Sequence, residues 1–261
     1  MRKRIPALYV SLILLLMYLP ILVVVVYSFN ASRYGNWTGF TLDWYRSLFN
    51  NRSIMGSLLN SLKVGLLSCG AAVVIGTAGA VGMSRSFFKG QGMLENVSIM
   101  PMMIPEIIMG MAYLTFFSFL RVSFGLLTLV IAHTTFCVPY IYINVQSRLA
   151  GMDPAYVEAA RDLGASPLKA FWTVTLPLIT PAVLSGSLLA FAMSMDDVVI
   201  SFFVTGPTTN TLPLQVYSML KTGVTPEINA LCTLMLGIIF IALALWGLFQ
   251  ARRKNVSGQN G

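Results

Sequence analysis

The sequence predicts an all-α integral membrane protein with six transmembrane helices and a cytoplasmic helical loop. Two observations support this fold class. The 261-residue chain is 56% hydrophobic and only 10% charged, whereas a soluble domain carries about 25% charged residues. Long stretches with few or no charges also recur along the chain, each with the roughly 20 residues that cross a hydrocarbon core. We therefore expect one membrane domain over residues 1–261.

The candidate spans are read from the uncharged or nearly uncharged runs. In order, these are Ala7–Phe29, Val64–Ser84, Asn96–Leu120 (interrupted by Glu106), Val122–Gln146, Leu178–Phe203 and Ile228–Gln250. The first run is longer than the apolar region of a signal peptide, about 7–15 residues, so we expect an uncleaved span there. An even number of spans places both chain ends on one side of the membrane.

The basic residues predict which side that is. Most of the 17 lysines and arginines lie inside if the N-terminus is cytoplasmic, as the positive-inside rule requires. Arg2, Lys3 and Arg4 precede the first span, and Arg252, Arg253 and Lys254 follow the last. The net charge of +8 is explained by such flanking residues. We therefore expect cytoplasmic termini and no nucleic-acid partner.

Cysteine, histidine and nucleotide-binding patterns argue against catalysis. Cys69, Cys137 and Cys232 lie in three separate apolar runs and form neither a metal-site spacing nor a disulfide framework. His133 lies in another apolar run, where a hydrogen-bonded packing role is expected. The chain has no phosphate-binding loop and no paired nucleophile and base. We therefore expect no metal, no cofactor bound by this chain and no enzymatic activity.

Prolines and a polar segment predict irregular stretches near the spans. Pro101 and Pro105 in the third span and Pro139 in the fourth are expected to break their helices. Such breaks are tolerated where protein or a water-filled cavity satisfies the freed carbonyls, which favours a substrate pathway over plain packing. After Phe203 a stretch rich in Gly, Pro and Thr precedes apolar residues 212–220, which predicts a short surface or re-entrant helix.

Helix signals divide the loop before the fifth span into two short helices. Asp153 is a good N-cap and Pro154 suits the first helical position. Gly164 suits the position just past the helix end. Ser166 and Pro167 repeat the start signal. The result is a compact elbow closed at a glycine.

The second helix of the elbow is expected to end at about Leu176, before Pro177, so the loop covers about residues 151–177. An apolar set is expected to be exposed on it, namely Tyr156, Val157, Leu163, Phe171 and Trp172. An exposed patch of this kind indicates docking to a partner rather than a solvated linker. An amphipathic loop that rests on lipid is the alternative.

The elbow resembles the EAA loop of ABC-importer permeases. The resemblance is carried by Glu158-Ala159-Ala160, by Gly164 and by Leu176-Pro177 before the penultimate span. It implies that the loop is a coupling helix that sits in a groove on a cytoplasmic ATPase. By this resemblance Ala159 and Ala160 permit close approach, Glu158 makes a polar contact to the ATPase, and Gly164 sets the elbow.

Longer stretches resemble the second (C-type) permease subunit of spermidine/putrescine importers. They are Ser194–Val199, Phe203–Pro207, Leu212–Leu214, Tyr217–Met219 and Pro226–Ala230. The resemblance implies a multi-pass protein of the bacterial inner membrane that works by alternating access. It also implies four kinds of partner: a sister permease, two ATP-binding subunits that use ATP and magnesium, a periplasmic polyamine-binding protein, and membrane lipid.

Three acidic residues lie within or at the edge of spans: Glu106, Asp196 and Asp197. A carboxylate at the bilayer centre costs about 2.5–3.5 kcal/mol and usually faces a cavity or a partner. Fixed carboxylates suit an elongated polycation, because each ammonium forms charge-assisted hydrogen bonds. Aromatic side chains are expected to cover its methylenes or add cation–π contacts; the candidates are Tyr113, Phe116 and Tyr217.

Several alternatives stay open on the residues alone. The aspartates could cap backbone or pair with a basic residue of a partner subunit, and Glu106 could be structural. Neighbouring side chains on a helix point about 100° apart, so we do not expect both aspartates to face one pore. The same architecture could carry an amino acid derivative, thiamine or ferric ion instead of a polyamine. A secondary transporter or channel is a further alternative.

Overall fold

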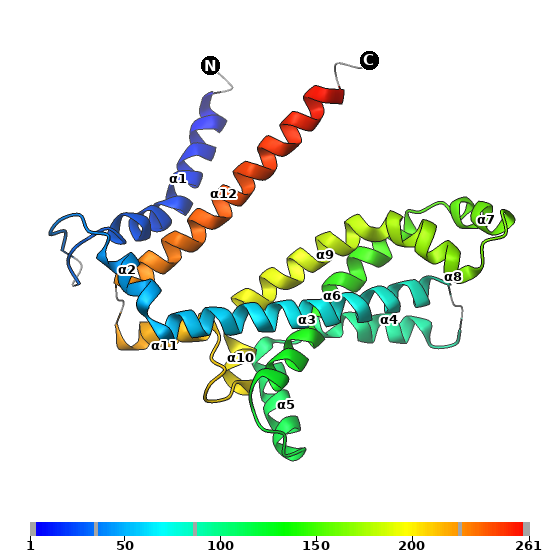
Figure 1. Ribbon diagram of the computed structural model, residues 1–261, viewed down its shortest axis with the longest axis horizontal. Coiled ribbons are helices and arrows are strands. Elements are labelled where there is room, and N and C mark those ends of the chain that lie inside the picture. Colours follow the sequence, from blue (N-terminus) through cyan, green and yellow to red (C-terminus); the bar gives the residue numbers. More distant parts are fainter. Residues whose placement is uncertain (1–3, 34–35, 86–87, 224–225, 258–261) are drawn as a thin grey trace. The chain divides into compact units, whose positions relative to one another are not determined.

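The computed structural model describes residues 4–33, 36–85, 88–223 and 226–257, and these form helices joined by short segments (Figure 1). Residues Arg2 and Lys3 lie outside the described part, as do the side chains of Arg252, Arg253 and Lys254. The helices are α1 (Arg4–Tyr27), α2 (Asp43–Asn50), α3 (Arg52–Arg85), α4 (Gln91–Ile99), η1 (Met100–Met102), α5 (Glu106–Phe119), α6 (Leu126–Ala150), α7 (Ala155–Asp162), α8 (Pro167–Ala170), η2 (Phe171–Thr175), α9 (Leu176–Asp196), α10 (Val199–Val204), α11 (Leu212–Thr222) and α12 (Pro226–Ser257).

The chain divides into two compact units. One comprises Met1–Met55 with Ser218–Gly261, and the other comprises Gly56–Tyr217. In the first unit α12 contacts both α1 and α2, and the Glu227 carboxylate accepts a hydrogen bond from the Ser47 hydroxyl. The prediction of a single membrane domain over residues 1–261 is not tested by this division and stays a prediction.

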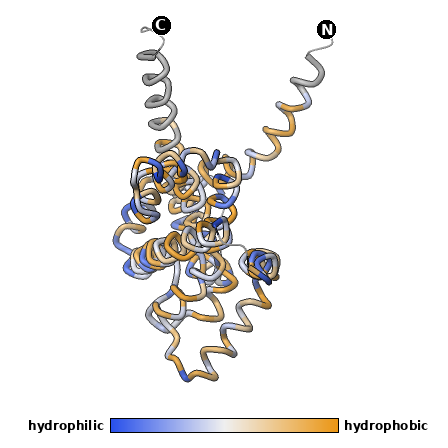
Figure 2. The backbone as a smooth tube through the Cα atoms, turned by 90° about the vertical axis from the view of Figure 1, so that its right-hand side faces the viewer, coloured by the Kyte–Doolittle hydropathy of each residue, from blue (hydrophilic) through white to orange (hydrophobic). Residues whose placement is uncertain are grey.

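Several described helices are long and apolar enough to cross a membrane. Four qualify singly, in Tyr9–Tyr27, Arg52–Arg85, Leu126–Ala150 and Pro167–Asp196. A fifth is added if α4 to α5 counts as one broken span. Hydrophobic residues run along most of the chain in Figure 2, and the side chains of α1 from Tyr9 to Val26 are largely exposed. The all-α membrane fold is therefore confirmed, whereas the count of six spans stays a prediction, because the described apolar part of α12 is shorter, Pro226–Ile241.

The third predicted span is broken at its prolines, as expected. A 3₁₀ turn over Met100–Met102 follows α4, and the two halves of the span are bent by 101°. Pro105 precedes α5 in an extended conformation, so the helix restarts at Glu106. Proline lacks the N–H that a continuing helix would need. Glu106 therefore lies in the first turn of a helix rather than inside one.

The break predicted at Pro139 is wrong, because α6 continues through this residue. Two neighbouring helices approach α6 closely near this residue. A Cβ placed on Gly76 of α3 would lie 3.1 Å from the Val138 carbonyl oxygen, and one on Gly186 of α9 would lie 3.0 Å from Ile141 Cα. Small residues allow membrane helices to pack backbone to backbone. This packing keeps the helix together around the proline.

The elbow helix also continues where an end was expected. Residues Pro167–Asp196 form one 30-residue helix, so the prediction of an end near Leu176 is wrong. A π-helical segment over Phe171–Thr175 widens the helix just before Pro177, which then lies in the first turn of α9. Within this continuous helix Pro177 cannot donate a backbone hydrogen bond to the preceding turn, and that turn is the π-helical segment. The Arg85 guanidinium fastens this segment to the end of α3 through a 2.7 Å hydrogen bond to Thr175 Oγ1.

At its other end, α9 stops earlier than the predicted span. Residues Asp197 and Val198 separate α9 from α10, and Asp197 has an extended backbone with φ −66° and ψ 123°. The helix predicted after the Gly, Pro and Thr-rich stretch is confirmed as α11. Its start is held by a 2.8 Å hydrogen bond from the Leu212 N–H to Ser61 Oγ.

Candidate functional site

Residues from five helical segments of the second unit line a cavity of about 270 Å³. Its wall is formed by Pro101, Met102, Ile104, Glu106, Met109, Phe136, Tyr140, Met193, Asp196, Asp197, Val198, Val199 and Ile200. All three intramembrane acids singled out from the sequence are therefore brought to one place. They come from the two broken regions of the chain, the start of α5 and the junction of α9 with α10.

Glu106 and Asp196 are the free carboxylates of this cavity. Both side chains are exposed, and neither has a hydrogen-bond or ion-pair partner within the described part of the chain. Glu106 lies in the first turn of α5, and Asp196 is the last residue of α9. An unpaired carboxylate in a membrane-spanning region is costly unless a cation or water solvates it. The pair can therefore receive a cationic ligand.

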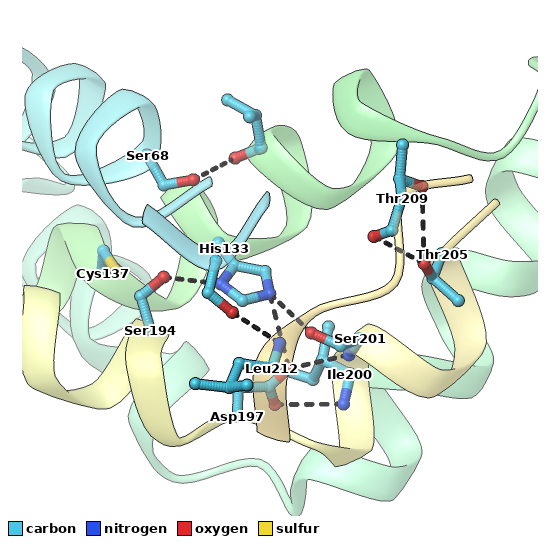
Figure 3. Close-up of polar contacts among 12 residues, drawn as sticks. Ser68, His133, Cys137, Ser194, Asp197, Ile200, Ser201, Thr205, Thr209 and Leu212 are labelled. Atoms are coloured by element: carbon cyan, nitrogen blue, oxygen red, sulfur yellow. Dashed lines mark hydrogen bonds and ion pairs between the residues drawn. The ribbon is translucent and has the colours of Figure 1, made fainter. Parts of the chain in front are cut away.

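Asp197 differs from its neighbour, because its carboxylate is buried and fully engaged (Figure 3). The Ile200 N–H donates to Oδ1 at 3.1 Å and the Ser201 N–H donates to Oδ2 at 2.7 Å. His133 Nε2 lies 3.4 Å from Oδ2. Asp197 thus caps the start of α10, which is the capping role considered from the sequence.

Both aspartates line the cavity, against the expectation that they would not share one pore. The expected 100° offset applies to neighbours within a helix, and α9 ends at Asp196. The Asp197 carboxylate itself is nevertheless turned toward α10 and His133. A role of Asp197 in the substrate pathway stays a prediction.

His133 is the hydrogen-bonded packing residue that was expected. Its side chain is completely buried in α6. Nδ1 lies 2.8 Å from Ser194 Oγ and Nε2 lies 3.1 Å from Ser201 Oγ. Each ring nitrogen thus contacts one serine hydroxyl, a group that can donate or accept a hydrogen bond. Within the described residues, no group of three or more metal-ligating side chains is found.

The aromatic wall of the cavity is not the one expected from the sequence. Phe136 and Tyr140 line it, whereas none of the aromatic candidates Tyr113, Phe116 and Tyr217 does. Tyr113 stacks on Phe117, with ring centroids 6.0 Å apart, and Phe116 and Tyr217 are exposed elsewhere. A sequence signal did exist: Phe136 and Tyr140 are four residues apart and so share one helix face.

The elbow has the cap geometry that its sequence predicts. Asp153 Oδ1 accepts a 2.9 Å hydrogen bond from the Ala155 N–H at the start of α7. At the end of α7, Gly164 has φ +85°, in the left-handed region that favours glycine. Two bonds close this end, from the Ala165 N–H to the Ala160 carbonyl (3.0 Å) and from the Gly164 N–H to the Arg161 carbonyl (2.9 Å). This pair is a Schellman motif.

Much of the elbow is open to contact. Leu163 is 90% exposed, Trp172 60% and Tyr156 58%, whereas Val157 and Phe171 are only half-buried. Glu158 and Ala159 are exposed and Ala160 is half-buried. A second cavity, of about 500 Å³, lies beside α7 and is lined in part by Glu158, Arg161 and Arg85. The loop therefore presents an apolar surface and a carboxylate together.

Leu176 and Pro177 have a different place from the rest of the motif. They lie in the first turn of α9, where Leu176 packs against the core and Pro177 is exposed. The two residues therefore belong to the helix that leads from the elbow to the acidic cavity. A direct role in ATPase coupling stays a prediction for them, as it does for Glu158 and the two alanines.

The all-α membrane fold, the exposed elbow and the acid-lined cavity between broken helices are the features expected of an importer permease. Residues 72–254 match the binding-protein-dependent transport system inner membrane components, and the chain belongs to this family. It is thus a membrane permease subunit of an ABC importer, as the elbow motif predicted.

Two similar relatives are named as polyamine permeases. The chain is 42% identical to the spermidine/putrescine transport system permease protein PotC of Escherichia coli (strain K12), over 91% of this chain and 90% of the relative. It is 40% identical to the putrescine transport system permease protein PotI of the same strain, over 91% and 88%. These relatives are transport subunits, which agrees with the prediction that the chain is not an enzyme.

Solved structures of more distant sequence share the fold. A bacterial ABC transporter involved in the import of the acidic polysaccharide alginate has a chain that aligns with a TM-score of 0.74 and 15% identity, covering 95% of both chains. The MetNI methionine ABC transporter in an inward-facing conformation aligns with a TM-score of 0.59 and 18% identity, over 80% of this chain and 95% of the other. At these identities the likeness concerns the fold alone.

Proposed function

We propose that this permease carries polyamines, spermidine or putrescine, across the inner membrane by alternating access. It forms the pathway with a sister permease, receives its substrate from a periplasmic polyamine-binding protein, and is driven by two separate ATP-binding subunits. ATP and magnesium belong to those subunits, and this chain binds no cofactor. The names of its PotC and PotI relatives support this substrate class.

The observation that carries the proposal is the pair of unpaired carboxylates in one cavity. Glu106 and Asp196 lie in the same wall without an internal partner among the described residues. An ammonium that enters exchanges water for charge-assisted hydrogen bonds to them, which are stronger than neutral ones. Phe136 and Tyr140 supply aromatic surface beside the acids for the methylene chain or for cation–π contacts. An anionic substrate would find like charge at this position.

The elbow supports the proposal for the ATPase partner. The apolar side chains of Tyr156, Leu163 and Trp172 are exposed on the elbow. Backbone hydrogen bonds close the end of α7 between the two helices of the elbow. Exposed patches of this kind mark interaction surfaces. If the elbow lies against a cytoplasmic ATPase, the six spans predicted from the sequence place both chain termini in the cytoplasm. The distribution of basic residues agrees with this orientation.

The test uses Glu106→Gln and Asp196→Asn in the complete transporter, reconstituted in lipid vesicles with its binding protein. Each charge-assisted hydrogen bond is worth about 1.5–3 kcal/mol, so polyamine transport per ATP hydrolysed is expected to fall by about 10- to 150-fold in each variant. ATP hydrolysis stimulated by the binding protein should persist, because the elbow is unchanged.

Glu95→Gln is the matched control, since Glu95 lies on α4 and does not line the cavity. It should transport polyamine as the unaltered chain does. Undiminished spermidine and putrescine transport by the double variant Glu106→Gln/Asp196→Asn would contradict the proposed site. Transport of thiamine, ferric ion or an amino acid derivative, with no polyamine transport, would contradict the proposed substrate.

A further inference from the structure

The junction between α9 and α10 is held by one buried imidazole ring (Figure 3). Nδ1 of His133 contacts the hydroxyl of Ser194 in the last turn of α9, at 2.8 Å. Nε2 contacts the hydroxyl of Ser201 in α10, at 3.1 Å, and lies 3.4 Å from the Asp197 carboxylate between the two helices. The two nitrogens of a single side chain therefore connect both sides of the helix break to α6.

We propose that His133 is a positioning residue of the permease: it fixes the end of α9 and so directs the carboxylate of Asp196 into the acidic cavity. His133 does not itself line the cavity. The inference rests on the proposed function only where it concerns polyamine transport. The positioning of residue 196 is independent of which solute the permease carries.

A helix break needs such fastening, because the last carbonyls of one helix and the first N–H groups of the next have no partners within their helices. Asp197 satisfies two N–H groups of α10. The other end of α10 is fastened to α6 as well, since Thr128 Oγ1 donates to the Val204 carbonyl at 2.7 Å. The short helix is thus tied to α6 at both ends, and His133 is the tie next to the cavity.

The surroundings of the ring restrict it further. His133 is fully buried, and its ring centroid lies 5.0 Å from that of Phe136, which lines the cavity. A buried polar network with all members satisfied gives a single arrangement, whereas a partly satisfied one does not. Loss of the Nδ1 contact with Ser194 should therefore release the α9 end, and with it the side chain at position 196.

Two substitutions separate the two ring nitrogens. In His133→Gln the carboxamide reaches the position of Nε2 and retains the link to Ser201 and Asp197. In His133→Asn it reaches only the position of Nδ1 and retains the link to Ser194. The inference predicts that the glutamine variant, which loses the contact with Ser194 of α9, releases residue 196, and that the asparagine variant keeps most of its positioning.

The first readout needs no polyamine. A cysteine introduced as Asp196→Cys is labelled in vesicles holding the complete transporter with a methanethiosulfonate that carries an ammonium group. The same transporter with only Cys69, Cys137 and Cys232 gives the background. Labelling of position 196 should fall by about 2- to 13-fold when His133→Gln is added, the change expected for one net hydrogen bond, and by much less with His133→Asn.

The second readout is polyamine transport per assembled complex in His133→Asn and His133→Gln with Asp196 in place. It should fall in the same order as the labelling. A merely structural role of His133 would lower the amount of assembled complex and leave both transport per complex and the labelling of position 196 unchanged, which would overturn the inference. If His133→Gln fails to assemble, Ser194→Ala, which removes the Nδ1 contact with α9, replaces it, and unchanged labelling there would also overturn the inference. Altered labelling in a transporter that carries no polyamine supports the positioning role and refutes the proposed substrate.

Discussion

The close contact of α6 with α9 predicts a specific cost for adding one methyl group at Gly186. A Cβ at this position would lie 3.0 Å from Ile141 Cα, 3.2 Å from the Tyr140 carbonyl oxygen and 3.3 Å from Asn144 Cβ. The first two are backbone atoms, which cannot rotate aside as a side chain can. The two helices must therefore move apart in Gly186→Ala. Because Tyr140 and Asp196 lie on these helices, the cavity changes with them.

The expected destabilisation follows from overpacking. Forcing an extra methyl into a packed contact costs about 1–3 kcal/mol, while replacing glycine by alanine within a helix returns up to about 1 kcal/mol. Gly70→Ala isolates the second effect, since nothing lies within 4 Å of a Cβ at Gly70 of α3. The difference between the two variants should thus be about 1–3 kcal/mol, or about 2–12 °C in Tm for a chain of this size.

The assay is thermal unfolding of the purified protein in detergent, followed by a thiol-reactive dye. Cys69 and Cys137 are buried, so the dye reports on their exposure as the packed helices separate. Gly186→Ala should unfold at a lower temperature than the unaltered protein, and Gly70→Ala at the same or a higher one. Equal Tm values for the two alanine variants would refute the reasoning about backbone contact.

Substitutions at three further positions each test one local feature of the structure. Asp197→Asn removes the negative charge that contacts two N–H groups and His133, so the stability of the protein should fall by about 1.5–3 kcal/mol. The amount of assembled complex recovered from membranes measures this loss. Recovery equal to that of the unaltered protein would contradict the capping role of Asp197. Gly164→Ala places a residue with a Cβ at φ +85°, which costs about 1–2 kcal/mol, and should reduce ATP hydrolysis coupled to transport. Gly164→Asn should have a smaller effect, because asparagine tolerates this backbone conformation. Equal effects of the two substitutions would argue against backbone strain. Thr175→Val removes the acceptor for the Arg85 guanidinium and should lower Tm by the equivalent of about 1.5–3 kcal/mol. Thr175→Ser, which keeps a hydroxyl acceptor, should restore the Tm.

Local signals predicted the elbow well, because its geometry is decided within a few residues. The cap at Asp153, the left-handed glycine at Gly164 and the second cap at Ser166 all form their expected hydrogen bonds. The same holds for the apolar runs that become α1 and α6. Caps and hydrophobicity act over one or two helical turns and are therefore readable in the sequence.

Proline had no single consequence, because packing decides its effect. Pro105 precedes a new helix, Pro139 lies inside an unbroken one, and Pro177 follows a π-helical segment. The local penalty is the same in each case, namely a missing N–H and a steric clash. Close approach of Gly76 and Gly186 to α6 holds the helix around Pro139. Such contacts join residues far apart in the sequence and leave no local signal.

The acidic site shows the same division. Its acidic residues and the break at Pro105 were predicted, but the break between α9 and α10 was not, and the capping role considered for either aspartate was not assigned to Asp197. Asp196 is exposed and has no partner among the described residues, whereas Asp197 is buried against His133, a partner 64 positions earlier on α6. Phe136 and Tyr140 were not singled out from the sequence, since the rotation of α6 that turns Tyr140 toward the cavity depends on its packing against α3 and α9. A pathway role of Tyr113, Phe116 and Tyr217 stays a prediction.

The most direct test of the account is uptake of labelled spermidine and putrescine by the native host lacking this gene, with and without the restored chain. The host must retain no other polyamine importer. The account predicts that the restored chain recovers polyamine uptake, that uptake requires ATP, and that the double variant Glu106→Gln/Asp196→Asn does not recover it. Uptake that is unchanged by loss of the gene would contradict the polyamine assignment. Uptake that survives ATP depletion but stops with an uncoupler would contradict the ATP-driven mechanism.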